Sequence, residues 1–121
     1  MEKPNIIKEK SYQFALDIVM LFKKLKLKNE YVLSKQLLRA ATSIGANIEE
    51  GSQAESRNDF IHKFAISQKE SFEAMYWLRL LKDSEYMEAT EANKLIGQCS
   101  EIQKIITAII KTAKSNQRSK K

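Results

Sequence analysis

The sequence predicts an all-α protein that folds as an antiparallel four-helix bundle with up-down-up-down connections. Apolar residues recur at steps of three and four in four separate segments, which is the period of an amphipathic helix. Only three glycines and one proline interrupt the 121 residues, and no segment alternates apolar and polar residues as a strand does. The four segments are joined by short connections, and short connections place consecutive helices side by side and antiparallel.

The chain length indicates one domain. We expect residues 1–10 to form a loose N-terminal arm, residues 11–114 the bundle, and residues 115–121 a disordered basic tail without apolar residues. A single cysteine cannot form an internal disulfide, which fits a reducing compartment. No apolar run approaches the roughly 20 residues of a membrane span, and the charged start lacks a signal-peptide core. We therefore expect a cytoplasmic protein without membrane contact.

The first helix is predicted from about Ser11 to Leu25. Its apolar stripe is formed by Phe14, Ile18, Leu21, Phe22 and Leu25.

Basic residues gather at the end of this helix and in the C-terminal tail, within a chain of net charge +6. Cations suit the C-terminal end of a helix dipole, and a basic surface also favours solubility, so these residues have a structural explanation. They could equally bind phosphates of a nucleic acid. The candidate nucleic-acid contacts are Lys23, Lys24, Lys26, Lys28, Arg118, Lys120 and Lys121.

The second helix is predicted from about Tyr31 to Glu50, after a short turn at Asn29 and Glu30. Gly45 in its interior costs about 1 kcal/mol relative to alanine, which suggests a close contact or a bend. Gly51 is expected to end the helix by taking a positive φ. The core face comprises Leu33, Leu37, Ala40, Ala41, Ile44 and Ile48.

Three polar residues of the second helix, Arg39, Asn47 and Glu50, could share one face. We expect Arg39 to pair with an acid of a neighbouring helix, such as Glu70 or Glu73, because a partly buried guanidinium needs partners. Asn47 and Glu50 would then satisfy backbone groups at the helix end and in the following loop. The alternative is a recognition surface; we favour the structural interpretation.

The third helix is predicted to start with a capping box at Ser56 and Asp59 and to end near Lys82. Its main apolar face carries Phe60, Phe64, Ser71, Met75 and Leu78. Four further apolar residues fall outside any single narrow stripe. Either a wide core face absorbs them, or they form a subunit contact, which we favour. These four residues are Ile66, Tyr76, Trp77 and Leu80.

The fourth helix is predicted from about Glu88 to Lys114. Its apolar stripe contains Ala92, Leu95, Ile96, Cys99, Ile102, Ile106, Ile109 and Ala113.

The sequence contains no enzyme signature. It lacks a phosphate-binding glycine loop, a dinucleotide fingerprint and a cysteine pair for zinc. A di-iron bundle needs two Glu-x-x-His elements, whereas His62 is the only histidine. Cys99 falls on a core stripe, where a thiol behaves as a small hydrophobe rather than a nucleophile. We therefore expect no enzymatic activity, no cofactor and no metal.

Aromatic and basic residues do not alternate along the chain, so the sequence shows no stacking platform for single strands. Nucleic-acid binding would rest on charge and depend steeply on salt.

The segment Gln36–Gly51, QLLRAATSIGANIEEG, resembles the signature of a family of small bacterial four-helix bundles. This family includes proteins encoded in 23S rRNA intervening sequences and the accessory variability determinant proteins of diversity-generating retroelements. Ser56, Phe60 and Phe64 match its downstream spacing, while Leu38 and Glu49 depart from its usual arginine and alanine. The motif residues to which we assign a structural or assembly role are Arg39, Ser43, Asn47, Glu50 and Gly51.

The resemblance implies more than the periodicity does. Members of this family form ring-shaped homopentamers with a central pore, and the retroelement relatives bind nucleic acid and a reverse transcriptase through a basic surface. We therefore expect a non-enzymatic oligomer that binds RNA or DNA, most plausibly structured RNA. The alternative is a ring-shaped scaffold that docks a protein partner such as a reverse transcriptase.

Overall fold

The computed structural model contains four helices, α1 (Glu2–Leu27), α2 (Val32–Ser52), α3 (Arg57–Asp83) and α4 (Ala89–Ser119). It describes the backbone of residues 2–119 and the side chains of residues 6–117. Within these ranges there is no strand, so the predicted all-α class is confirmed. Nor does any helix there combine the length and apolar character that crossing a membrane requires.

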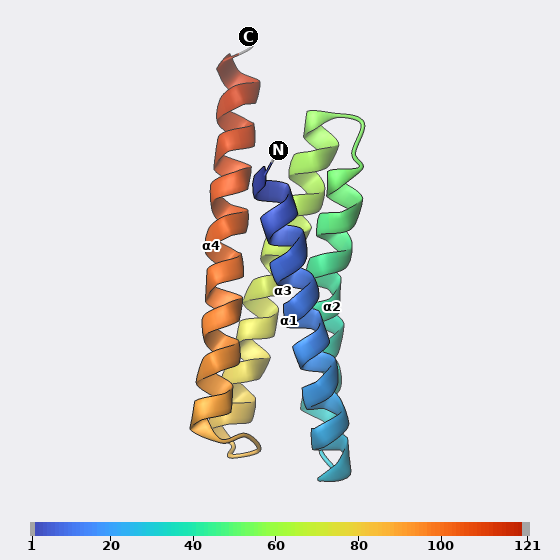
Figure 1. Cartoon of the computed structure of the whole chain (residues 1–121), viewed down its shortest axis with the longest axis vertical. Helices are drawn as coiled ribbons and strands as arrows, with labels where there is room; N and C mark the ends of the chain where they lie inside the picture. The colour runs from blue at the N-terminus through green and yellow to red at the C-terminus, as the bar shows by residue number, and fades with distance from the viewer. Residues whose placement is uncertain (1, 120–121) are drawn as a thin grey trace.

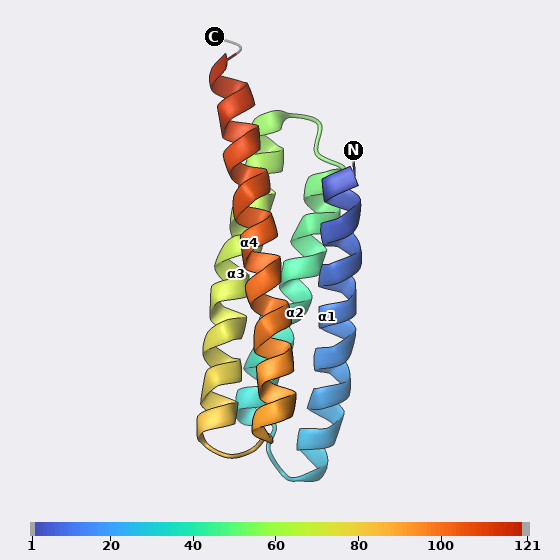
Figure 2. The ribbon, with the colours of Figure 1, turned by 60° about the vertical axis from the view of Figure 1, so that its left-hand side comes forward.

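The helices form a bundle in which each helix packs against two others (Figures 1 and 2). The touching pairs are α1 with α2, α2 with α3, α3 with α4, and α4 with α1. Among the described residues, the backbones of the diagonal pairs α1–α3 and α2–α4 do not approach each other closely. Consecutive helices run antiparallel, and the start of α1 lies at the same end as the end of α4, as Figure 1 shows. The predicted up-down-up-down arrangement is confirmed.

The apolar stripes of the four helices meet in one core, as their helical period predicts. Phe22, Leu33, Phe60, Met75 and Ile96 are only half-buried at its edge. The largest fully buried side chains are Phe14, Phe64, Ile7, Ile18, Leu25, Leu37, Ile44, Ile48, Leu78, Leu81, Ile102 and Ile106.

The structure corrects two predicted boundaries. The segment 2–10, predicted as a loose arm, continues α1 because Ile7 is fully buried in the core and Lys8 pairs with Glu49 of α2 at 3.6 Å. Residues 115–119, predicted as disordered, continue α4, and Gln117 there donates a hydrogen bond to Asn58 of α3. Each extension contacts another helix of the bundle. The pattern of apolar residues along a single helix does not reveal such a contact.

Helices α1 and α3 end in the same type of turn. Asn29 and Glu85 each have a φ of 66°, and the amide that follows each one donates to a carbonyl five residues earlier. These are the bonds of a Schellman motif, in which a left-handed residue satisfies the last carbonyls of a helix. Both turns lie at the same end of the bundle (Figure 1).

Helix α2 begins with a cap that the sequence analysis missed. The buried carboxylate of Glu30 accepts hydrogen bonds from the backbone amides of Val32 at 3.1 Å, Leu33 at 2.9 Å and Ser34 at 2.8 Å. Burial alone would raise the pKa of Glu30, but these hydrogen bonds outweigh burial and lower the pKa below its ordinary 4.5. At α3, Ser56 accepts from the Asp59 amide at 3.0 Å, as predicted.

Candidate nucleic-acid interface

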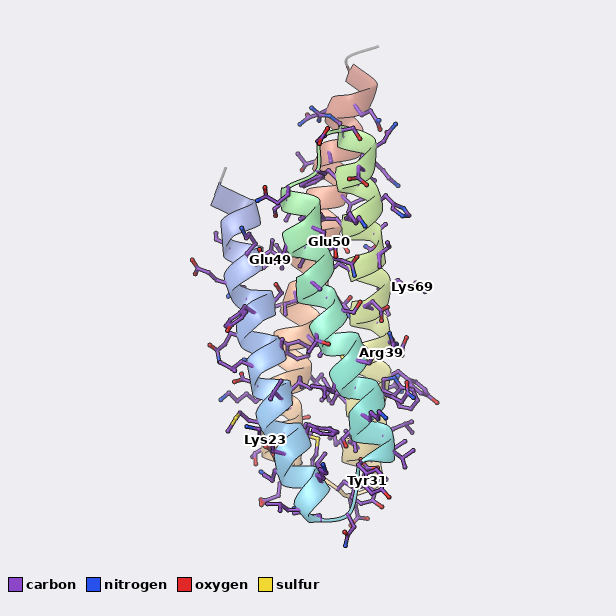
Figure 3. The ribbon with its side chains drawn as sticks, turned by 90° about the vertical axis from the view of Figure 1, so that its right-hand side faces the viewer. Lys23, Tyr31, Arg39, Glu49, Glu50 and Lys69 are labelled. Atoms are coloured by element: carbon purple, nitrogen blue, oxygen red, sulfur yellow. The ribbon has the colours of Figure 1, made fainter. Side chains whose placement is uncertain are left out.

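The predicted lysine cluster lies at the end of α1, and Figure 3 shows Lys23 towards the end of the bundle that holds Tyr31. Lys23, Lys26 and Lys28 are exposed and form no ion pair with a described residue. Lys24 differs, because its amine lies 3.1 Å from both carboxylate oxygens of Glu91 on α4. Three of the four predicted lysines are therefore available to a ligand, and the fourth joins α1 to α4.

A groove of about 510 Å³ runs between α1 and α4 beside these lysines. Its apolar lining includes Met20, Leu21 and Leu95, and Lys94 of α4 is on its rim. The groove thus brings a fifth basic residue, distant in sequence, next to the predicted cluster. Asp17 and Glu91 also line it, but each already has a partner, because Gln98 donates to Asp17 at 3.2 Å and Lys24 pairs with Glu91.

The opposite end of the bundle is acidic. A hollow of about 870 Å³ between the end of α2 and the start of α3 is lined by four carboxylates, of which that of Glu50 pairs with Lys63 at 3.0 Å and that of Glu49 with Lys8 at 3.6 Å. Figure 3 shows Glu49 and Glu50 far from Lys23. A polyanion is therefore attracted to one end and repelled from the other. The four carboxylates belong to Glu49, Glu50, Glu55 and Asp59.

Arg39 joins α2 to α3, as predicted. Its guanidinium pairs with Glu73 and lies 3.5 Å from Glu70. Glu73 also accepts from the indole nitrogen of Trp77 at 3.1 Å. The hydrogen bond from Arg39, helped by that from Trp77, holds the pKa of Glu73 below its ordinary 4.5. This guanidinium is engaged within the monomer.

The other polar motif residues act differently from the prediction. Asn47 donates to the Ser43 carbonyl at 2.9 Å and to the Ser43 hydroxyl at 3.1 Å, one turn back in its own helix. Glu50 reaches across to Lys63 of α3 rather than to the loop. Both contacts therefore belong to α2 and its seam with α3, and neither satisfies backbone at the helix end.

The two motif glycines mark close approaches between helices. Gly51 is buried inside α2 without a positive φ, so the expected helix stop is wrong. A Cβ atom there would lie 2.8 Å from the ring of Phe64 on α3. Gly45 faces Ser11 of α1, and a Cβ atom there would lie 3.6 Å from the Ser11 hydroxyl. Of the close contact or bend expected at Gly45, the structure shows a contact with α1, at an ordinary van der Waals distance where a Cβ atom would still fit.

No catalytic pair is formed by the two side chains considered for one. His62 is exposed on α3, whereas Cys99 is fully buried and its thiol donates to the Ser71 carbonyl at 3.3 Å. Burial raises the pKa of the Cys99 thiol to about 12, so it is not a nucleophile near neutral pH. No group of histidine, cysteine and acidic side chains within the described part of the chain could hold a metal ion.

A family model for 23S rRNA-intervening sequence proteins matches residues 3–108 of the chain. The chain belongs to the 23S rRNA-intervening sequence protein family. The resemblance seen in Gln36–Gly51 is therefore confirmed. No functionally curated protein matches the chain.

A solved relative supports both the family and the fold. It is a protein of unknown function from the S23 ribosomal protein family of Bacteroides thetaiotaomicron VPI-5482, known from a crystal structure. The two chains are 47% identical, with a TM-score of 0.88, over 90% of this chain and 98% of the relative. Neither this match nor the 23S rRNA-intervening sequence protein model names an enzymatic activity.

The four residues predicted as a subunit contact differ in how exposed their side chains are. Tyr76 is exposed, whereas Trp77 is half-buried and packs against the core. Ile66 and Leu80 are also half-buried. Their role in assembly stays a prediction.

Sequence reasoning missed several exposed apolar residues of α1 and α3. Phe72 of α3 and Tyr12, Leu16 and Met20 of α1 are all exposed. Removing the core stripe from each helix and inspecting what remains would have revealed them.

The basic residues of the predicted tail remain untested in this intervening-sequence protein. The Arg118 side chain, Lys120 and Lys121 lie outside the part of the chain that the structure describes.

Proposed function

We propose that this protein is a non-enzymatic, oligomeric module that binds structured RNA through the basic surface at the end of α1. The observation that carries the proposal is the group of exposed lysines without ion pairs, Lys23, Lys26 and Lys28, next to the groove bordered by Lys94. Membership in a family of 23S rRNA-intervening sequence proteins supports RNA as the nucleic acid. Because α4 ends at the other end of the bundle from this surface (Figure 1), the predicted tail contacts Arg118, Lys120 and Lys121 would belong to a second, separate basic site.

The chemistry of this surface sets the kind of recognition. Lysine amines contact phosphates as point charges, and phosphate contacts carry no sequence information directly. The acidic hollow at the opposite end orients the RNA, because its carboxylates repel the backbone. We therefore expect weak sequence preference and an affinity that falls steeply with salt.

A charge-reversal experiment tests the proposal. Fluorescence anisotropy would compare a structured RNA with a matched duplex DNA, at low and at physiological salt. The variant Lys26→Glu with Lys28→Glu should bind RNA several-fold more weakly than wild type. The control Lys104→Glu with Lys111→Glu has the same net charge but alters exposed lysines of α4 outside the cluster.

Three results would count against the proposal in this experiment. Equal losses in the two charge-reversed variants would indicate a general polycation effect, and so would binding confined to low salt and equal for both ligands. Absence of binding at either salt would reject RNA binding altogether.

We further propose that the module is a homopentameric ring, in line with its resemblance. The support is the position of exposed or half-exposed apolar residues on two helices at diagonal corners of the bundle. Leu16 and Met20 are exposed on α1, and Ile66 and Leu80 are half-buried on α3. A contact between two different faces is heterologous and generates a ring when its rotation closes. A monomer in sedimentation at micromolar concentration would contradict the ring.

The second candidate function is a ring that docks a partner enzyme such as a reverse transcriptase. The exposed apolar stripe of α1, Tyr12, Leu16 and Met20, favours a protein contact of this kind. Failure to bind RNA at either salt, together with sedimentation as an oligomer, would favour the scaffold. For either function we place the protein in the cytoplasm, in agreement with its free, buried Cys99.

A further inference from the structure

We infer that the outer face of α3 is a stacking surface for unpaired RNA bases, formed by Phe72 and Tyr76 between Lys69 and Arg79. This inference rests on the proposed RNA binding and specifies its substrate class. The sequence analysis found no such platform, because it sought aromatic and basic residues that alternate along the chain. In the structure the four residues are brought together by the helical period instead.

The four side chains share one exposed face. Positions 69, 72, 76 and 79 are separated by steps of three and four, which align residues along a helix. The exposed fraction is 59% for Phe72 and 53% for Tyr76, and Lys69 and Arg79 are also exposed. Figure 3 shows Lys69 at the outer edge of α3. The two rings start about 6 Å apart along the helix axis, since each residue rises about 1.5 Å.

The Tyr76 ring has a fixed neighbour that limits its freedom. The Trp77 ring lies 5.1 Å away, centroid to centroid, at an interplanar angle of 73°. Trp77 in turn packs against the core and donates to Glu73 at 3.1 Å. An edge-to-face neighbour that is itself anchored reduces the entropy lost when a base stacks on the tyrosine.

The charge of this face suits a polyanion. Lys69 and Arg79 form no ion pair with any described residue. The only carboxylates between them in sequence, Glu70 and Glu73, turn towards α2, where Arg39 binds both. Phosphates can therefore approach the two cations while bases cover the rings, the arrangement found in single-strand binding grooves.

The exposed stripe on α1 differs in chemistry. Beyond Tyr12 it is aliphatic, with Leu16 and Met20, and the exposed carboxylate of Glu9 stands one turn before it. Aliphatic side chains offer no π-face to a base, so the α1 stripe suits a second copy of the chain and the α3 face suits RNA. The lysine cluster can contact phosphates whether the bases are paired or not, whereas the α3 face can select unpaired bases.

Trp77, the single tryptophan, provides a built-in probe for the test. The full-length protein would be titrated at physiological salt with a single-stranded oligoribonucleotide and with a duplex RNA of equal length. We expect the single strand to quench Trp77 fluorescence and the duplex to leave it unchanged. Phe72→Ala with Tyr76→Ala should weaken single-strand binding about tenfold or more, measured by anisotropy.

Tyr86→Ala is the matched control, because it removes an exposed tyrosine that lies between α3 and α4, outside both the α3 face and the α1 stripe. It should leave single-strand affinity unchanged. Circular dichroism and sedimentation would show that all variants are folded and assembled as wild type, as expected for exposed positions.

The experiment gives different results if the inference fails and if the proposed function fails. If the Phe72 and Tyr76 variant binds single strands as wild type does, while Lys26→Glu with Lys28→Glu weakens binding, the inference is wrong and the proposed function stands. If the aromatic variant sediments as a smaller species, the face is a subunit contact and the inference is overturned. If neither RNA binds, both are rejected.

Discussion

Gly51 of α2 lies directly against the ring of Phe64 of α3. A Cβ atom at Gly51 would lie 2.8 Å from two ring carbons of Phe64 and 3.1 Å from the Lys63 Cβ atom. The Phe64 ring cannot easily move away, because it is fully buried and stacked on Phe60 with centroids 4.3 Å apart. The glycine of the family motif therefore allows two helices to touch.

Replacing Gly51 tests this contact. Gly51→Ala should destabilise the protein by about 1 to 3 kcal/mol, the usual range for overpacking, although alanine favours a helix. Gly97→Ala is the control, because a Cβ atom there meets nothing within 4 Å. It should stabilise by up to about 1 kcal/mol. Urea unfolding gives both values, and equal stabilities of the two variants would refute the role assigned to Phe64.

Glu30 makes stability depend on acid pH. The folded pKa is lowered, so the carboxylate contributes stability above about pH 4.5, and that stability is lost as pH falls through the folded pKa. Glu30→Gln should cost about 1 to 2 kcal/mol at pH 7, as loss of a helix cap does. The difference from wild type should shrink below pH 4.5. Urea unfolding from pH 7 to pH 3 measures it, with exposed Glu55→Gln as the control.

Glu85 occupies a backbone conformation that favours glycine, with a φ of 66°. A residue with a Cβ atom in this region is strained by about 1 to 2 kcal/mol, and glycine removes that strain. Glycine also has more conformational freedom in the unfolded chain, which offsets part of the gain. Glu85→Gly should therefore stabilise the protein by about 0.5 to 1 kcal/mol. Glu85→Ala keeps the strained Cβ atom and should bring no gain. Thermal unfolding compares the two, and a lower melting temperature for the glycine variant would contradict the assignment.

Arg39 is expected to act in structure rather than in recognition. Its side chain is 51% exposed, so its pairs with Glu70 and Glu73 are screened by solvent. Arg39→Gln should lower stability by less than about 1 kcal/mol, and by less still in high salt. RNA affinity should stay as in wild type, because the guanidinium already has partners. A loss comparable to that of the lysine variant would move Arg39 into the RNA interface.

The Cys99 thiol should be unreactive in the folded protein. Burial raises the pKa of its thiol to about 12, and the thiolate is the reactive form. Reaction with a thiol-specific chromogenic disulfide at pH 8 should be slow, and complete as soon as urea unfolds the chain. Absorbance against time follows both, and rapid modification of the native protein would show that the fourth helix opens locally.

Helical periodicity was sufficient to predict the fold. The same period that buries Phe14, Leu37 and Ile106 predicted the number and core faces of the helices, and the short connections predicted their antiparallel direction. The ends of α1 and α4 were predicted less well, because Ile7 and Gln117 depend on partners in other helices. The pairing of Arg39 with acids of α3 was predictable because an isolated guanidinium at a helix seam needs a counter-charge.

Other parts of the site depend on distances across the bundle, which a linear pattern does not contain. Nothing in the sequence shows that Lys94 borders the groove near Lys23, or that Lys24 is taken up by Glu91. The role of Gly51 was misjudged because a buried glycine and a helix-ending glycine look alike in sequence. Phe72 was overlooked because a buried and an exposed phenylalanine look alike in a sequence this rich in apolar residues, and it is 59% exposed.

The order of contacts around the bundle has a consequence for how the chain folds. Three of the four touching helix pairs are consecutive in sequence, and the most extensive packing joins α2 to α3. Such local topology gives low contact order and rapid folding, with the α2–α3 hairpin as the natural nucleus. Contact between α1 and α4 requires the longest loop closure, so it forms last. We therefore expect that seam, which also holds the basic groove, to open most readily in the folded bundle.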